Sequence, residues 1–342
     1  MSRSPFPAVA PDRVLIVRIS AMGDLVFASP LAATIKARWP ECRISWLVTP
    51  ALAGLLDSVP GVDEVIPWTP PRGLGWLPSL RALRRQLAER DFDWVIDAQG
   101  LLKSRALAAQ ANAWRVGFDS GEPGKWWLNR VLPKGGDVAL ISSEYRFLAE
   151  QLTGRASAPP RLVPAHTDAA ADCLQQAGLA PGWVALCPFT TRPQKHWPEE
   201  YWPALMRLLA EAGAGPVAVL GGPDDSDAAD AMIAAAGTGA VNLAGRTPVK
   251  LLPGVITSAG AVIGVDTGLT HIGIATGRPT VAIFGSTRPY LRGGNAPFRV
   301  LYDALPCAPC QRRPTCAGHF TCLRVITPER VLAALRELVP SP

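Results

Sequence analysis

The chain has 342 residues, of which 48% are hydrophobic and 18% are charged, a composition typical of a folded protein and not of a disordered one. At about 150 residues per domain, this length predicts two domains, each large enough to bury its own core. No stretch reaches the roughly 18 uninterrupted apolar residues that a membrane span requires. The apolar stretch between Pro7 and Pro11 is too short for a signal peptide. We therefore expect a cytoplasmic protein.

The net charge is +6 and is spread evenly, since residues 1–150 and residues 151–342 each carry a net charge of +3. This even distribution argues against a basic tail for nucleic acid. Two segments of the first half are locally basic, 72–90 and 103–134. They are either solvated helix faces or a surface that meets an anionic partner. The candidate contacts with such a partner are Arg72, Arg84, Arg85, Lys103 and Arg105.

β-branched apolar runs alternate with helical patterns along the first half of the chain. The runs predict buried strands at 14–19, 43–48, 64–67 and 94–97, and the helical patterns lie at 25–39, 51–56 and 77–89. Strands that alternate with helices indicate a parallel sheet with crossover helices. The pattern fades at residues 156–160 (Ala-Ser-Ala-Pro-Pro), which we interpret as an interdomain linker.

The same alternation restarts after this linker. Strands are predicted at 183–187, 216–220, 261–265 and 280–284, and helices at 198–212, 225–236 and 328–338. The sequence thus predicts an α/β protein of two doubly wound units, 1–160 and 161–342, whose last helix could pack back on the first. Ligands of such sheets bind beyond the carboxyl ends of the strands. With two facing units, we expect the site in the cleft between them.

The turn after the first predicted strand, Ser20–Asp24, has neither of the glycine-rich spacings that bind dinucleotides or cradle phosphates. It places the carboxylate of Asp24 at the start of a helix. Asp24 either caps this helix or acts as a general base for a hydroxyl group.

Two segments of the second half carry the residue types of an anion site. After the strand at 261–265, Asp266, Thr267, Gly268 and His271 open a helix, whose N-terminus offers partial positive charge to phosphate oxygens. The segment 188–198 adds hydroxyls and the cation of Lys195 at the end of the preceding strand. The alternative for His271 is a structural role, and the alternative for segment 188–198 is a capped helix with an early proline.

Four of the seven cysteines, Cys307, Cys310, Cys316 and Cys322, lie close together in the sequence. Their spacing suits a metal knuckle on one side, although the second pair is wider than is usual for zinc. A structural zinc or iron site, reduced loop thiols and disulfides all remain open, and a cytoplasmic location disfavours stable disulfides.

Four stretches together resemble the heptosyltransferases of glycosyltransferase family 9. They are VLIVRISAMGDLVFASPLA, DWVIDAQGLLKS, TTRPQKHWPEEYW and GVDTGLTHIGIATGRPTVAIFGSTRP, spread over residues 14–289. The resemblance implies a GT-B architecture of two Rossmann-like domains. The N-terminal domain would bind the acceptor, usually the inner Kdo of Kdo2-lipid A, and the C-terminal domain would bind ADP-heptose.

The resemblance also implies roles for single residues. Asp24 would be the catalytic base of an inverting transfer that requires no cofactor. The donor would contact Thr190, Thr191, Lys195, Asp225, Asp266, Thr267, Gly268 and His271. A polyanionic acceptor would explain the basic segments and implies peripheral contact with the inner face of the inner membrane. Some related heptosyltransferases carry cysteine-rich tails, and one branch binds iron and modifies proteins, so a protein acceptor is an open alternative. The same scaffold also leaves a sugar-nucleotide epimerase or hydrolase open.

Overall fold

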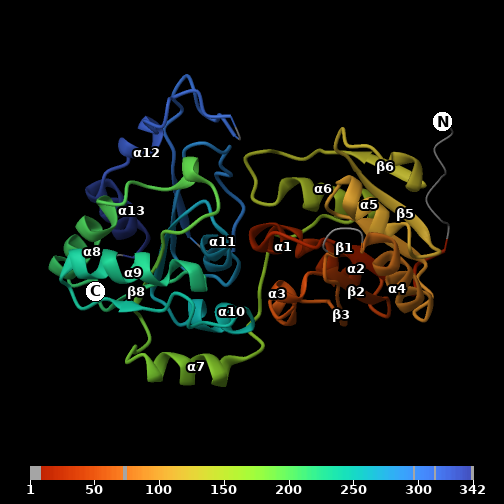
Figure 1. Cartoon of the computed structure of the whole chain (residues 1–342), viewed down its shortest axis with the longest axis horizontal. Coiled ribbons are helices and arrows are strands. Elements are labelled where there is room, and N and C mark those ends of the chain that lie inside the picture. Colours follow the sequence, from red (N-terminus) through yellow and green to blue (C-terminus); the bar gives the residue numbers. More distant parts are fainter. Residues whose placement is uncertain (1–8, 72–74, 296, 312, 340–342) are drawn as a thin grey trace. The chain divides into compact units, whose positions relative to one another are not determined.

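Figure 1 shows the protein as a computed structural model that describes residues 9–71, 75–295, 297–311 and 313–339. The chain divides into two compact units. One runs to Val138 and includes Ser142–Pro160, and the other comprises Ala139–Ile141 and the chain from Arg161 onward. Each unit is built around one six-stranded sheet.

The first sheet is parallel throughout, with the order β3-β2-β1-β4-β5-β6. Its strands are β1 (Arg13–Val17), β2 (Arg43–Val48), β3 (Glu64–Pro67), β4 (Trp94–Asp97), β5 (Trp114–Asp119) and β6 (Arg130–Pro133). β1 lies between β2 and β4, and Val14 is in register with Ile44 and Trp94. The strand order reverses here, which is where doubly wound sheets bind their ligands.

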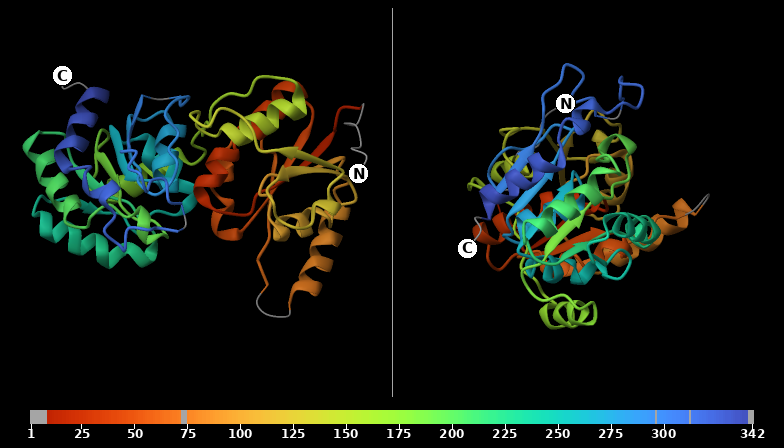
Figure 2. Two further views of the ribbon diagram at one scale, coloured as in Figure 1. Left: turned by 90° about the horizontal axis from the view of Figure 1, so that it is seen from above. Right: turned by 90° about the vertical axis from the view of Figure 1, so that its left-hand side faces the viewer.

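Helices cover both faces of this sheet. They are α1 (Met22–Ala28), α2 (Pro30–Arg38), α3 (Pro50–Ala53), η1 (Leu56–Ser58), α4 (Trp76–Ala88), α5 (Leu102–Ala108), η2 (Lys125–Trp127) and α6 (Ser143–Thr153). α4 and α5 share a core with Leu15 and Val17 of β1, and α2 and α6 pack together on the other side (Figure 2, left). The single helix predicted at 25–39 is two helices, because Pro30 lacks an N–H and begins α2.

The second sheet repeats the plan, with the order β12-β11-β10-β7-β8-β9. Its strands are β7 (Val184–Cys187), β8 (Val217–Val219), β9 (Val241–Asn242), β10 (Ala261–Val265), β11 (Thr280–Ile283) and β12 (Phe298–Leu301). The order reverses between β7 and β10, where Gly264 is in register with Cys187. A Cβ at Gly264 would lie 2.2 Å from the Thr270 hydroxyl, so only glycine fits this crossing.

The helices of the second unit are α7 (Thr167–Gln176), η3 (Pro193–Lys195), α8 (Tyr201–Glu211), η4 (Pro223–Asp225), α9 (Ser226–Ala236), η5 (Val249–Leu251), α10 (Leu252–Thr257), α11 (Gly268–Ala275), α12 (Thr321–Arg324) and α13 (Pro328–Leu338). α8 and α13 pack on one face of the sheet with the buried indoles of Trp197 and Trp202. α13 thereby lies against α8, β11 and β12 of its own unit.

The segment predicted as a linker is packed at its centre. Ser157 is buried, and its hydroxyl lies 2.8 Å from the hydroxyl of Thr34 on α2. The division between the units follows three residues later, after Pro160. Within the described ranges, none of the helices has the length and apolar character that crossing a bilayer demands.

Candidate active site

In the second unit, a cluster of polar side chains surrounds Asp266, which directly follows β10. One carboxylate oxygen, Oδ2, accepts from Lys195 Nζ at 2.5 Å and from the Thr287 hydroxyl at 2.6 Å. The other, Oδ1, lies 3.2 Å from His271 Nε2. Lys195 also reaches the backbone carbonyl of Asp266 at 3.3 Å. Segments that the sequence analysis selected separately, 190–195 and 266–271, thus meet at the carboxyl edge of β7 and β10.

The surroundings of Asp266 keep its carboxyl group ionised. Burial opposes ionisation, but the hydrogen bonds and charges of His271 and Lys195 lower its pKa far below the ordinary value. If His271 Nε2–H donates to the carboxylate, its Nδ1 can accept from the hydroxyl of Tyr290, 2.9 Å away. In the ion pair beside it, the charges of Lys195 and Asp266 cancel each other.

Local structure explains how these side chains reach one edge. Thr267 has an extended backbone (φ −139°, ψ 162°) and is the N-cap of α11, which turns the chain at the end of β10. His271 lies one turn into α11 and is buried. The short helix η3 begins with Pro193 and ends at Lys195, which returns the chain after β7 toward Asp266. Thr287 follows β11, the next strand along.

The other predicted donor contacts lie along the same edge of the sheet. Thr190 is half-buried and Thr191 is exposed just after β7, and the Thr190 carbonyl lies 2.7 Å from His196 Nε2. Asp225 follows β8 and accepts from the Gly222 N–H at 2.8 Å. No side-chain bond joins Asp225 to the Asp266 cluster in the described residues, so its contact with a ribose stays a prediction.

In the first unit, Asp24 lies in the first turn of α1, beyond the carboxyl end of β1. Its Oδ2 pairs with Arg18 and accepts from the Ala21 N–H at 3.2 Å. Its Oδ1 accepts no hydrogen bond from the described residues, and the side chain is 42% exposed. Asp24 therefore contributes to the helix start and also leaves one carboxylate oxygen open to a ligand.

Arg18 orients this carboxylate from a buried position. Its guanidinium donates to the Ala98 carbonyl at 3.3 Å and lies 5.8 Å from the ring centre of Tyr145. Tyr145 is buried, which raises the pKa of its phenol well above the ordinary value. Sequence reasoning missed Arg18 and Tyr145. Arg18 follows the same strand as Asp24, whereas Tyr145 comes from α6, more than 100 residues away.

Arg105, predicted to contact an anionic partner, has a different role. Its side chain is fully buried, and its Nη2 donates to the Phe118 carbonyl at 2.8 Å and the Ser120 hydroxyl at 2.9 Å. Its Nε lies 3.7 Å from the buried carboxylate of Asp97. Burial raises the pKa of Asp97 despite backbone hydrogen bonds and the nearby guanidinium. We therefore remove Arg105 from the acceptor set, because its side chain is fully buried inside the unit.

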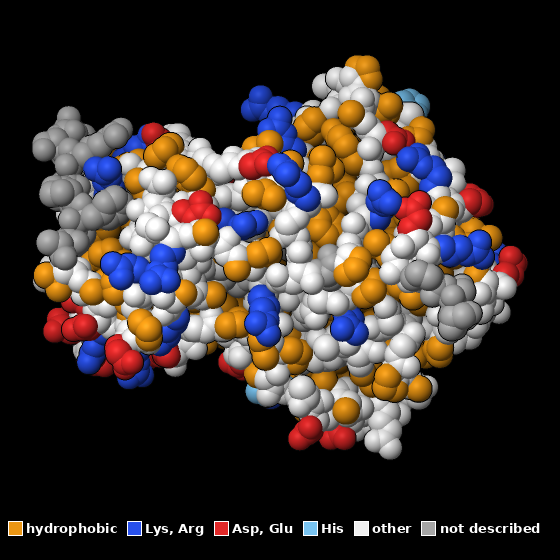
Figure 3. Space-filling view, turned by 180° about the vertical axis from the view of Figure 1, so that it is seen from behind, with side chains coloured by type: hydrophobic (Ala, Val, Ile, Leu, Met, Phe, Trp, Pro, Cys, Tyr) orange, Lys and Arg blue, Asp and Glu red, His pale blue; other side chains and the backbone are white. Residues whose placement is uncertain are grey.

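The remaining basic candidates lie on or beside α4. Arg84 and Arg85 are exposed on this helix, and Lys103 is half-buried with its ammonium 5.3 Å from the ring centre of Trp68. Partial burial lowers the pKa of Lys103. Arg72 lies outside the described residues. On the face shown in Figure 3, Lys and Arg side chains are interspersed with Asp and Glu and form no continuous basic patch.

The four clustered cysteines lie before and within α12. In the part of the chain that the structure describes, no group of three or more His, Cys, Asp or Glu side chains is arranged to hold a metal ion, so the metal site that the sequence left open is not supported. All four cysteines are free thiols. Burial and the neighbouring thiols raise the pKa of Cys322. The alternative of reduced loop thiols stays a prediction.

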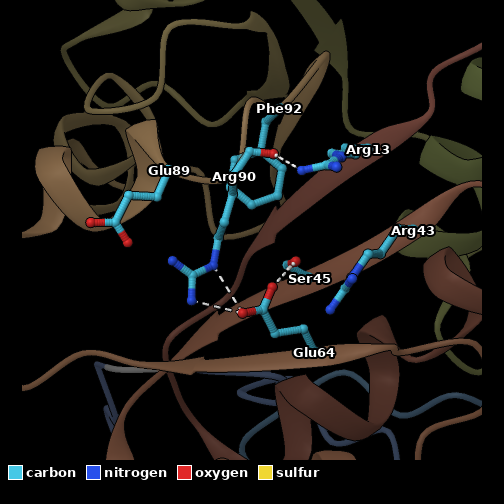
Figure 4. A pocket seen from close by; sticks show the side chains of 7 residues that line it. All are labelled: Arg13, Arg43, Ser45, Glu64, Glu89, Arg90 and Phe92. Carbon is cyan, nitrogen blue, oxygen red and sulfur yellow. Dashed lines mark hydrogen bonds and ion pairs between the residues drawn. The ribbon is translucent and has the colours of Figure 1, made fainter.

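A pocket of about 290 Å³ in the first unit lies at the opposite edge of the sheet, where β1, β2 and β3 begin. Figure 4 shows that Arg90 pairs with Glu64, which also accepts from Ser45, that Arg13 donates to the Arg90 carbonyl, and that Glu89 points away. Burial opposes the effect, but the hydrogen bonds from Arg90 and Ser45 lower the pKa of Glu64. Because these bonds join β1, β2 and β3 to the turn after α4, we assign this pocket a structural role.

Two doubly wound sheets of identical order are also the architecture of the solved heptosyltransferase structures, which have the GT-B fold. The sequence profile described as Glycosyltransferase family 9 (heptosyltransferase) matches residues 80–320, and the chain belongs to this family. The resemblance seen in the sequence, the predicted fold class and the prediction of a glycosyltransferase are thereby confirmed.

Relatives and solved structures agree with this assignment. The chain is 29% identical to lipopolysaccharide heptosyltransferase 1 of Pseudomonas aeruginosa, over 96% of this chain and 99% of that protein. It is 29% identical to the enzyme of the same name from Escherichia coli K12, over 82% and 90% of the two chains. The structure of E. coli heptosyltransferase WaaC with ADP-2-deoxy-2-fluoro heptose has a TM-score of 0.72 at 26% identity, covering 95% of this chain and 99% of that one.

Proposed function

We propose that the protein transfers heptose from ADP-heptose to the inner Kdo of Kdo2-lipid A in the synthesis of the lipopolysaccharide core. The observation that carries the proposal is the pair of carboxylates at the two reversal points. Asp266 has both oxygens occupied by donors, whereas Asp24 keeps one oxygen free. Asp266 is therefore suited to hold cations, and Asp24 is suited to accept a proton. Similarity to heptosyltransferases that are named for lipopolysaccharide supports the choice of sugar and acceptor.

The donor would bind the second unit. ADP-containing complexes are known for the related WaaC. In this protein the diphosphate would meet Lys195, the hydroxyls of Thr190 and Thr191, and the backbone at the start of α11. The positive end of α11 favours the negative charge that develops on the leaving ADP. Held by Asp266, Lys195 is already oriented toward this edge before the nucleotide arrives.

The acceptor would bind the first unit with its hydroxyl at Asp24. The acceptor oxygen forms a bond to the anomeric carbon as the bond from that carbon to the diphosphate breaks. Its proton passes to Asp24 Oδ1, and ADP leaves with the bonding electrons. Arg18 fixes the orientation of the carboxylate during this step. Arg84, Arg85 and Lys103 would meet the anionic groups of the acceptor.

A lipid acceptor implies contact with a membrane surface. Trp126 is 66% exposed and follows Lys125 in η2, and an exposed indole beside a cation is typical of side chains that insert at a bilayer interface. We propose that this corner of the first unit meets the inner face of the inner membrane. Sedimentation with anionic vesicles tests this, and Trp126→Ala should reduce the bound fraction more than Leu291→Ala, which removes an exposed side chain of the second unit.

The decisive experiment is incubation of the purified protein with ADP-heptose and Kdo2-lipid A, followed by mass spectrometry of the lipid and quantification of ADP. One heptose added per ADP released is expected. Asp24→Asn should abolish transfer, while Asp63→Asn, which removes a carboxylate paired with Lys36, should not. ADP released without an acceptor would instead indicate a hydrolase, and labelling of protein without lipid would indicate the protein acceptor. The relatives favour neither alternative.

A further inference from the structure

A second pocket, in the second unit, adjoins the Asp266 cluster. It has a volume of about 510 Å³ and is lined by Arg192, Thr287, Arg288, Cys310, Gln311 and Arg313. This volume lies within the range of small-molecule sites. Three arginines and no acidic residue line it, and no carboxylate in the described residues forms an ion pair with any of the three. The pocket therefore has an uncompensated positive charge.

The cysteine-containing loop forms one wall of this pocket and is held in place by hydrogen bonds. The Gln311 N–H donates to the Ser286 carbonyl at 2.6 Å, and the Gln194 side chain donates to the Gln311 carbonyl at 3.0 Å. Ser286 lies just after β11, and Gln194 lies in η3 beside Lys195. These bonds fix Gln311 against the strand ends that carry the Asp266 cluster. Arg313, two residues further along the loop, is thereby held near the same strand ends.

Thr287 links the pocket to Asp266. Its hydroxyl donates to the Asp266 carboxylate at 2.6 Å, and the residue also lines the pocket. Within the cluster, the positive charge of Lys195 is balanced by the carboxylate of Asp266, with which it is paired. A nucleoside diphosphate carries two to three negative charges, and its departure adds charge at the β-phosphate. Cations beyond Lys195 are therefore needed at this edge.

We propose that Arg288 and Arg313, with Arg192, form the cationic part of the donor site and bind the diphosphate of the sugar nucleotide. The inference rests on the proposed function and extends it, because it assigns diphosphate recognition to residues after β11 and in the cysteine loop. Guanidinium groups bind phosphate oxygens in a planar, bidentate manner. Location favours the donor over an acceptor anion, since all three arginines belong to the unit that carries Lys195 and Asp266.

Calorimetric titration with ADP, inorganic pyrophosphate and adenosine tests the proposal without any acceptor. Arg288→Ala and Arg313→Ala should each weaken ADP binding by about 10- to 100-fold, as expected for a lost hydrogen bond to a charged group. The affinity for pyrophosphate should fall in parallel, and the affinity for adenosine should be unchanged. Arg288→Lys should recover part of the affinity, because it keeps the charge and loses the fork.

Two control variants remove arginines that lie outside the pocket. Arg336→Ala removes an exposed arginine of α13, and Arg207→Ala removes an exposed arginine of α8. Both should bind ADP like the wild type. Thermal unfolding tests whether every variant is folded. Because Arg288 and Arg313 are exposed, we expect their variants to fold like the wild type.

The other outcomes of these titrations would contradict either the diphosphate assignment or the proposed donor. Unchanged ADP affinity in both alanine variants, or an equal loss for ADP and adenosine, overturns the diphosphate assignment. A raised acceptor KM with normal ADP affinity also overturns it and assigns the pocket to an anionic group of the acceptor. If the wild type binds no ADP, the proposed donor fails as well.

Discussion

The contact between Lys195 and Asp266 gives a quantitative prediction. Their side chains are 17% and 13% exposed, and their charged atoms are 2.5 Å apart. We expect Lys195→Met and Asp266→Asn each to lower the free energy of unfolding of the second unit by about 3 kcal/mol, because each leaves a mostly buried partner uncompensated. For Lys195→Met the partner is a carboxylate whose low pKa keeps it ionised at neutral pH.

The double variant should cost less than the two losses together. With both charges removed, neither partner is left unpaired, so the coupling should amount to about 1–3 kcal/mol. The remaining cost reflects bonds that survive only in part, since Asp266 also accepts from Thr287 and approaches His271.

Urea unfolding followed by tryptophan fluorescence measures these energies, since Trp183, Trp197 and Trp202 are all buried in the second unit. Asp225→Asn is a matched control, because its carboxylate accepts a local backbone N–H and forms no ion pair in the described residues. Additive losses, with a coupling below about 0.5 kcal/mol, would refute the conclusion that the pair is a buried, mutually dependent unit.

Three further predictions concern the first unit. Asp24→Ala should lower kcat by about 10²–10⁴-fold at a stability cost of about 1 kcal/mol, and a normal kcat in a less stable variant would end its assignment as the base. Arg84→Ala combined with Arg85→Ala should raise the KM of an anionic acceptor and leave ADP affinity unchanged, an effect that should shrink with salt because exposed charges are screened over about 8–10 Å; loss of ADP binding instead would contradict the domain roles. Glu64→Gln should cost at most about 1 kcal/mol at pH 7, because its pair with Arg90 is partly exposed. Since the fold lowers the pKa of Glu64, its stabilisation is present above the unfolded value of about 4.3 and is lost as the pH falls through the folded value. The stabilities of the wild type and the variant should therefore converge as the pH falls below the folded value.

The sequence predicted best the strands that are clear apolar runs. β2, β3, β4 and β10 have the predicted bounds, because each is an apolar run stopped by a clear turn or proline. β5, β6, β9 and β12 were not predicted. β5, β6 and β12 each include an arginine and partly buried residues, and β9 has only two residues, so the apolar pattern is weak. Such strands owe their pairing to the neighbouring strand, and that information is not local.

The candidate site was predictable where its residues follow a strand directly. Asp24, Lys195, Asp266 and His271 were selected in this way, and the structure joins the last three in one cluster. Arg105 was misjudged because a basic segment does not reveal which of its members is buried. The carbonyls of Glu122 and Pro123 that accept from Arg105 come from a loop whose path only the fold defines.

The two carboxylates also show why their roles cannot be exchanged. A general base must have a lone pair free to accept a proton, and both oxygens of Asp266 are occupied by donors that include a cation. Protonation of Asp266 would break these bonds and leave Lys195 unpaired. Asp24 has its donors on Oδ2 alone, so Oδ1 can take a proton while Arg18 and the Ala21 N–H keep the group oriented. In the mechanism that we propose, the same residue type serves as a fixed anchor in one unit and as the base in the other, and the hydrogen-bond partners decide which.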